Sequence, residues 1–167
     1  MLEIQRLKII IITDNGTYGF DEKFTRGLNF IASIDNTCGK SSVLEAIYYC
    51  LGFEEIIGGQ TEKVLTPVYK SNIKDEEKEY AVLQSSMLLQ ISNGHDIITI
   101  MRSAKMENRK SKLITVFYSP LENIYDKDTD KDDMYVHSSN SAQHEKGFHT
   151  FLEKFLGMSL PIVATTD

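Results

Sequence analysis

The sequence has few cysteines, no long apolar run and no excess of positive charge. Its 167 residues include two cysteines, Cys38 and Cys50, whose spacing suits neither a disulfide framework nor a zinc cluster. A reducing, cytoplasmic setting is therefore the simplest expectation. No apolar run approaches the roughly 20 residues that a membrane-spanning helix needs, and the first residues lack the ordered regions of a signal peptide. The sequence predicts no membrane partner.

The scarcity of positive charge excludes one mode of nucleic-acid binding. The formal net charge is -6 and the isoelectric point is near 5.2, so general basicity cannot attract a polyanion, although a local basic patch can. One such stretch lies between two predicted strands and is opposed only by Glu107; its members are Arg102, Lys105, Arg109, Lys110 and Lys112. It is either a hairpin tip that contacts a DNA backbone or a solvated loop, and we favour the loop.

An alternating run of aspartates over Asp126–Asp133 has the spacing of a calcium loop but not its other residues. Lys131 stands where such a loop has its glycine, and His137 stands where it has its glutamate. We interpret the run as a charged surface segment.

Turn residues divide the first part of the chain into short strands. β-Branched residues predict a strand over Leu2–Thr13, which the turn formers Asp14–Gly16 end. A second strand is expected over Tyr18–Phe24 and a third over Leu28–Ser33. Three strands would thus precede the segment that carries the main motif.

Helical and hairpin patterns follow. Apolar residues at helical spacing predict a helix from near Val43 to Leu51 that packs against the sheet, and Gly52 suits its C-terminal end. Asn93 and Gly94 are a hairpin signal between two apolar strands. The expected later elements are strands over Tyr80–Ile91, Ile97–Met101, Leu113–Tyr118 and Met134–Val136, a loop over Pro120–Asp133, and a helix carrying Phe148, Phe151, Leu152 and Phe155 that ends at Gly157. We expect one domain without internal repeats.

Gly39, Lys40 and Ser41 form the second half of a phosphate-binding loop. Such a loop needs inward backbone N–H groups, a lysine for the terminal phosphates and a hydroxyl for magnesium, between a strand and a helix. Lys40 would bridge the β- and γ-phosphates, Ser41 would bind Mg²⁺, and Ser42 would reach the α-phosphate. The usual first glycine is replaced by Ile34. The predicted nucleotide-binding residues are Asn36, Thr37, Cys38, Gly39, Lys40, Ser41 and Ser42, and no catalytic residue is assigned.

Two common classes of phosphate-loop protein fit the sequence poorly. Small nucleotide kinases usually place the loop after the first strand, whereas here an antiparallel hairpin comes first. Small GTPases need a downstream N-K-x-D motif that reads the base, and the sequence contains none. A complete phosphotransferase would also need an acidic catalytic residue near the loop, for which no clear candidate exists.

The first 52 residues resemble the N-terminal head segment of the SMC superfamily, which includes chromosome-organising SMC proteins, SbcC-type repair ATPases, RecN and RecF. That family has a G-L-N-x-I strand, an N-G-x-G-K-S loop and a helix with A-I-x-x-x-L-G. This chain carries Gly27–Ile31, Asn36–Ser41 and Ala46–Gly52 at the matching places. Thr37 replaces a glycine that is common in the family loop.

The resemblance implies that ATP with Mg²⁺ is bound here and hydrolysed only when two heads meet. It also implies that the Walker B aspartate and its neighbouring glutamate lie in a C-terminal lobe beyond a long coiled coil. After Ser42 the sequence has neither an apolar run ending in Asp-Glu nor an S-G-G signature. By the same analogy the turn over Thr13–Tyr18 neighbours the adenine and ribose, and Arg6 is a further candidate.

We therefore expect an α/β fold of the P-loop NTPase class, namely an ABC-type N-terminal head lobe with an antiparallel β-subdomain over residues 1–167. Its expected function is ATP-driven engagement of two heads on DNA, in repair, chromosome maintenance or defence. The expected partners are a second head, the C-terminal lobe, DNA, and accessory or nuclease subunits. The isolated chain should be inactive. The alternative is a nucleotide-sensing or interaction scaffold with a degenerate loop, which Ile34 keeps open.

Overall fold

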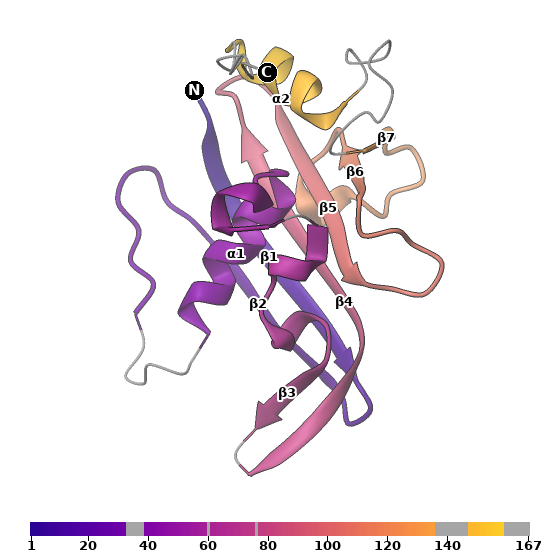
Figure 1. Ribbon diagram of the computed structural model, residues 1–167. Helices are drawn as coiled ribbons and strands as arrows, with labels where there is room; N and C mark the ends of the chain where they lie inside the picture. Colours follow the sequence, from indigo (N-terminus) through magenta and orange to yellow (C-terminus); the bar gives the residue numbers. More distant parts are fainter. Residues whose placement is uncertain (33–38, 60, 76, 136–146, 159–167) are drawn as a thin grey trace, which may run out of the picture.

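Seven antiparallel strands form the sheet on which the chain is built (Figure 1). The computed structural model describes residues 1–32, 39–59, 61–75, 77–135 and 147–158. The sheet order is β2-β1-β4-β5-β6-β7, and β3 pairs with β4 beside this path. The strands are β1 Glu3–Thr13, β2 Thr17–Lys23, β3 Asn72–Asp75, β4 Lys78–Ser92, β5 Ile97–Lys105, β6 Leu113–Phe117 and β7 Lys131–Tyr135.

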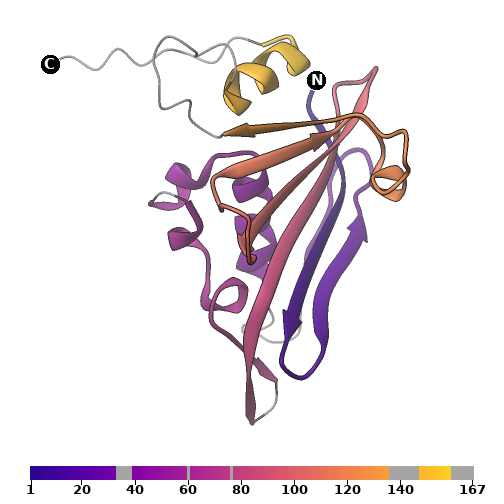
Figure 2. The same ribbon diagram turned by 90° about the vertical axis from the view of Figure 1, so that its right-hand side faces the viewer.

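The helical segments lie mainly on one face of this sheet. Helix α1 covers Lys40–Cys50, and the short 3-10 helices η1 Glu54–Ile57, η2 Thr61–Val64 and η3 Pro67–Tyr69 follow it. They lie on the same side of the sheet, whereas η4 Leu121–Asn123 lies on the opposite side (Figure 2). Helix α2, Phe148–Leu156, covers the end of the sheet nearest the N-terminus. None of these described helices combines the length and apolar character needed to cross a membrane.

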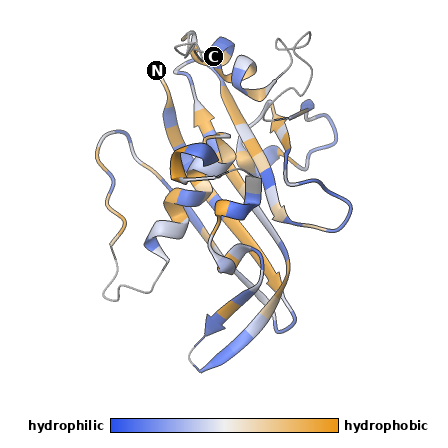
Figure 3. Ribbon diagram, viewed as in Figure 1, coloured by the Kyte–Doolittle hydropathy of each residue, from blue (hydrophilic) through white to orange (hydrophobic). Residues whose placement is uncertain are grey.

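Strand alternation decides which residues enter the core. Leu7, Ile9 and Ile11 of β1 are buried on the face that α1 covers, because successive side chains of a strand point to opposite faces. They join buried residues of β4, β5, β6 and α1 in one main cluster. A smaller cluster around Leu88 and Phe117 lies under η4 on the other face. Hydrophobic residues accordingly concentrate along the central strands (Figure 3).

Most of the expected elements are confirmed within a few residues. The strands expected over Leu2–Thr13 and Tyr18–Phe24 are β1 and β2. The two strands expected on either side of the Asn93–Gly94 turn are β4 and β5, which pair with each other, and the strand expected over Leu113–Tyr118 is β6. Helix α1 begins at Lys40, and Gly52 and Gly157 follow the two helices with φ of 72° and 62°. These left-handed glycines end the helices as expected, since a residue without Cβ adopts positive φ at little cost.

Two expectations are wrong. The third strand, expected over Leu28–Ser33, is not present in residues 28–32, and Ser33 lies outside the described residues. No described strand pairs with this segment, and β2 pairs with β1 alone. The last strand begins at Lys131 instead of Met134, because β6 offers Lys131–Asp133 backbone partners that local sequence does not reveal.

Candidate nucleotide site

The start of α1 carries the Gly-Lys-Ser motif. Gly39 precedes the helix with φ of 74° and ψ of 17°, a left-handed conformation that favours glycine. A Cβ at this position would meet only the Oγ of Ser42, at 4.0 Å, so the requirement for glycine comes from the backbone and not from crowding. The first turn contains no acidic residue, so no carboxylate in it offsets the positive end of the helix dipole.

The structure places four of the seven predicted nucleotide-binding residues. Gly39, Lys40, Ser41 and Ser42 are consecutive at the helix start, with Ser41 exposed and Ser42 half-buried. Asn36, Thr37 and Cys38 lie outside the described residues, as does Ile34. Exposure of Ser41 leaves its hydroxyl accessible from solvent, which a magnesium ligand requires.

Ser42 links the helix to η3 through hydrogen bonds that the sequence did not indicate. Its Oγ lies 3.2 Å from Oγ1 of Thr66, and its carbonyl accepts a hydrogen bond of 2.7 Å from the hydroxyl of Tyr69. The backbone N–H of Thr66 donates to Glu45 at 3.0 Å. The first turns of α1 are therefore held against the Thr66–Tyr69 segment, and burial raises the pKa of Tyr69.

An apolar cavity of about 240 Å³ lies beside the helix start. Its walls come from β1, β2, the beginning of α1 and the segment around η3. Tyr18 and Phe20 of β2 line it together with Gly39 and Ser42. The expectation that the Thr13–Tyr18 turn neighbours a base is therefore compatible with the position of Tyr18, which lies at the same cavity as the end of the motif.

The far end of α1 is fixed by a buried ion pair. Arg102 of β5 and Glu54 of η1 are joined by bonds of 2.7 and 2.9 Å, and their side chains are 0% and 3% exposed. The Arg102 guanidinium also donates to the carbonyls of Tyr49 and Ser111, at 2.6 and 2.9 Å, and lies 3.7 Å from the centre of the Tyr49 ring. This network joins helix, sheet and the β5–β6 loop.

Burial of Arg102 alters the interpretation of the basic stretch. Arg102 cannot contact DNA, Lys105 donates to the carbonyl of Val82 at 2.6 Å, and Arg109 donates to Thr115 at 2.7 Å. Lys110 and Lys112 remain exposed. The favoured interpretation as a solvated loop therefore holds only for part of the stretch, because Arg102 and Lys105 belong to β5 and Arg102 is fully buried.

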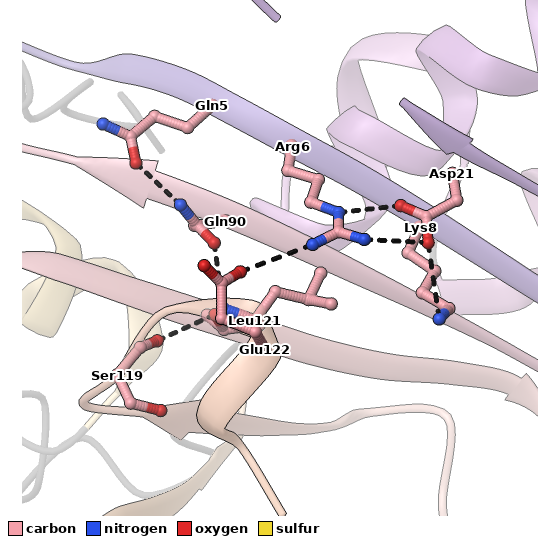
Figure 4. A network of polar contacts seen from close by, with 9 residues as sticks. Gln5, Arg6, Lys8, Asp21, Gln90, Ser119, Leu121 and Glu122 are labelled. Carbon is pink, nitrogen blue, oxygen red and sulfur yellow. Dashed lines mark hydrogen bonds and ion pairs between the residues drawn. The ribbon is translucent and has the colours of Figure 1, made fainter. Parts of the chain in front are cut away.

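Arg6 lies on the face of the sheet opposite α1, so the expectation that it neighbours the adenine is not supported by its position. It donates to Asp21 at 2.7 and 3.0 Å and to Glu122 at 3.4 Å (Figure 4). The hydrogen bond from Arg6 holds the pKa of the Asp21 carboxyl below its usual value. Because Leu7 faces the core, its neighbour Arg6 must face outward.

The aspartates near β7 are engaged in hydrogen bonds. Asp132 accepts from the Tyr118 hydroxyl at 2.8 Å, and Asp133 accepts from the hydroxyl of Thr115. In the ranges that the structure describes, no group of three or more His, Cys, Asp and Glu side chains is arranged to hold a metal ion. Tyr49 is fully buried, so its ring packs in the core and is not accessible to a nucleotide base.

Comparison with protein-family models, with curated proteins and with solved structures finds no match to this chain.

Proposed function

We propose that this chain binds Mg-ATP through Asn36–Ser42 and is the N-terminal lobe of an SMC-like ATPase head. The observation that carries the proposal is the position of Gly39, Lys40 and Ser41 at the start of α1, with a left-handed Gly39 and an apolar cavity beside it. Phosphate oxygens are stabilised at a helix N-terminus by N–H groups and by the helix dipole. Lys40 would contact the terminal phosphates, and Ser41 would bind Mg²⁺.

Exposed apolar residues ahead of the motif support a second lobe. Leu28 and Phe30 are 78% and 83% exposed in an extended segment that lacks a strand partner among the described residues. Neighbouring large apolar side chains on a surface commonly mark a contact with another polypeptide. A strand from the C-terminal lobe that the resemblance implies would cover them. Engagement of two such heads on DNA is the activity that the resemblance assigns to the assembled protein.

The binding step is tested by titrating Mg-ATP into the chain by calorimetry. We expect saturable binding that Lys40→Ala abolishes or weakens at least tenfold, because the substitution removes the charge that contacts the terminal phosphates. Lys127→Ala is the matched control, since Lys127 is an exposed lysine on the loop that follows η4. Equal ATP affinities in the native chain and Lys40→Ala would reject the assignment of the loop.

The split-head part of the proposal makes a separate prediction about turnover. The isolated chain should bind ATP without hydrolysing it, because the residues that complete the site belong to the other lobe and to a second head. Steady ATP hydrolysis by the pure chain, measured as phosphate release, would contradict this part. Binding without turnover that persists after both lobes are combined would favour the scaffold alternative.

A further inference from the structure

We infer that the Thr66–Tyr69 segment, which contains η3, controls phosphate affinity by fixing Ser42 in the first turn of α1. Thr66 and Tyr69 are then positioning residues of the site, because they act on the phosphates only through Ser42. They follow Ser42 by 24 and 27 residues and lie outside the Gly-Lys-Ser motif. The inference rests on the proposed nucleotide binding and adds the residues that set its strength.

The start of α1 is held only weakly by hydrogen bonds of its own. No side chain caps the helix within the described residues, and its first backbone bond, from the N–H of Val43 to the carbonyl of Gly39, is 3.3 Å long. That length exceeds the usual range of about 2.7–3.2 Å for an N–H···O bond. The first N–H groups of a helix have no helical acceptors, and here they are the groups proposed to hold the phosphates. Their direction therefore depends on contacts from outside the helix.

Thr66 and Tyr69 supply such contacts at Ser42. The hydroxyl of Tyr69 donates to the carbonyl of Ser42 at 2.7 Å, a normal length for an O–H···O bond. Burial raises the pKa of Tyr69, so at neutral pH this hydroxyl stays protonated and remains a donor. The Oγ1 of Thr66 lies 3.2 Å from the Oγ of Ser42. The backbone and the side chain of Ser42 are thus both fixed by the segment.

The hydroxyls of Ser42 and Thr66 form a pair that suits a phosphate. Each hydroxyl carries one hydrogen, so when one donates to the other, the acceptor keeps its own hydrogen for a further partner. Neither hydroxyl has another partner among the described residues. With Thr66 as the donor, the hydrogen of Ser42 is available to the α-phosphate that this residue is proposed to reach. Thr66 thereby orients the Ser42 hydroxyl without contacting the ligand.

The segment is itself fixed on its other sides, so it can support α1. The backbone N–H of Thr66 donates to Glu45 of α1 at 3.0 Å. Ser85 of β4 donates to the carbonyl of Tyr69 at 2.6 Å and accepts from the backbone N–H of Lys105 at 3.1 Å. Tyr69 and Ser85 are both buried. The sheet therefore holds η3, and η3 holds the start of α1.

Calorimetric titration of Mg-ATP into variants that lack one hydroxyl tests this role. Tyr69→Phe and Thr66→Val each remove a hydroxyl and keep the size of the side chain. Each should weaken Mg-ATP binding by about threefold to tenfold, the factor that one hydrogen bond contributes. Thr66→Ser keeps the hydroxyl and should bind Mg-ATP as the native chain does. Native affinity in folded Tyr69→Phe or Thr66→Val would overturn the role of that residue.

Thr99→Val is the matched control for lost stability. The hydroxyl of Thr99 is buried on β5 and donates to the carbonyl of Ser119 at 2.9 Å, on the face of the sheet opposite α1. Its loss should lower the melting temperature but leave the Mg-ATP affinity unchanged. Equal weakening in this control and in both test variants would show general damage and would refute the inference. Thr66 is only half-buried, so its variants decide the test if Tyr69→Phe does not fold.

Hydrogen exchange gives a second measurement, because coupling between two sites is reciprocal. If the segment fixes the phosphate site, bound Mg-ATP should slow exchange of the Thr66 amide. The amide of Tyr118, which donates to the carbonyl of Asp130 at 3.0 Å, is the reference and should exchange at an unchanged rate. Exchange at Thr66 that nucleotide does not slow would contradict the coupling. If Lys40→Ala binds Mg-ATP as tightly as the native chain, the proposed function fails; if Lys40→Ala weakens binding and the Thr66 and Tyr69 variants do not, this inference alone fails.

Discussion

The buried pair of Arg102 and Glu54 allows a stability prediction with a defined magnitude. Glu54→Gln keeps the size of the side chain and one acceptor oxygen but removes the negative charge. Arg102 then remains fully buried and keeps its hydrogen bonds to the carbonyls of Tyr49 and Ser111 and its contact with the ring of Tyr49, but it loses the carboxylate that is bonded directly to it. The substitution therefore measures the cost of removing the directly bonded counter-charge from a buried guanidinium.

Removal of one partner of a buried pair costs about 3–5 kcal/mol of unfolding free energy. The remaining acceptors around Arg102 compensate in part, so we expect a loss near the lower limit, about 3 kcal/mol. A chain of this size changes its melting temperature by about 2–4 °C for each kcal/mol, which gives a decrease of about 6–12 °C. Urea unfolding followed by circular dichroism measures the free energy directly.

Two further variants make this prediction specific. Asp21→Asn removes the exposed partner of Arg6 and should cost no more than about 1 kcal/mol, as surface pairs do. Arg102→Met combined with Glu54→Leu should cost less than Glu54→Gln alone, because the carbonyls of Tyr49 and Ser111 keep other donors, the N–H of Gly52 and the hydroxyl of Tyr49. A Glu54→Gln protein as stable as Asp21→Asn would refute the reasoning.

Two predictions concern the helix start and the buried thiol. Gly39→Ala should lower the free energy of unfolding by about 1–2 kcal/mol, because the φ of Gly39, 74°, is strained for a residue with Cβ. Gly147→Ala should lower it by less, because the φ of Gly147 is -76°. Equal losses for the two variants in chemical denaturation would contradict this reasoning. Burial raises the pKa of the Cys50 thiol to about 12 from 9.0, so it should resist iodoacetamide at pH 8.5 in the folded chain and react after denaturation, as peptide mass spectrometry can establish. The pKa of this thiol is higher in the folded chain than in the unfolded chain, so its contribution to stability is complete below pH 9 and is lost as the pH rises toward 12. A free energy of unfolding that stays constant over this pH range would contradict the raised pKa.

Local patterns predicted the elements well because their signals are local. The β-branched run of β1, the Asn93–Gly94 turn and the apolar spacing of α1 each depend on residues close in the sequence. The strand expected over Leu28–Ser33 failed because strand pairing needs a neighbour, and apolar composition alone does not supply one. Without a neighbouring strand, the side chain of Phe30 stays exposed.

The candidate site could be predicted only in part. The motif places Lys40 and Ser41 at a helix start, but the contacts of Ser42 with Thr66 and Tyr69 join segments more than twenty residues apart and leave no local pattern. The burial of Arg102 was not predicted, although the sequence carries a pattern that indicates it. Strand alternation places it on the same face as the buried Ile98 and Ile100, which indicates burial instead of a DNA contact.

The anchoring of α1 also sets an order of events during synthesis. Tyr49 bonds to Arg102 and Ser111, which follow it by 53 and 62 residues. Contacts between residues so distant in sequence form late, and a growing chain cannot form them until the later residue has been made. We expect α1 to stay undocked until Ser111 has emerged from the ribosome. A chain stopped before that residue would carry the complete Gly-Lys-Ser motif without the anchored helix that presents it.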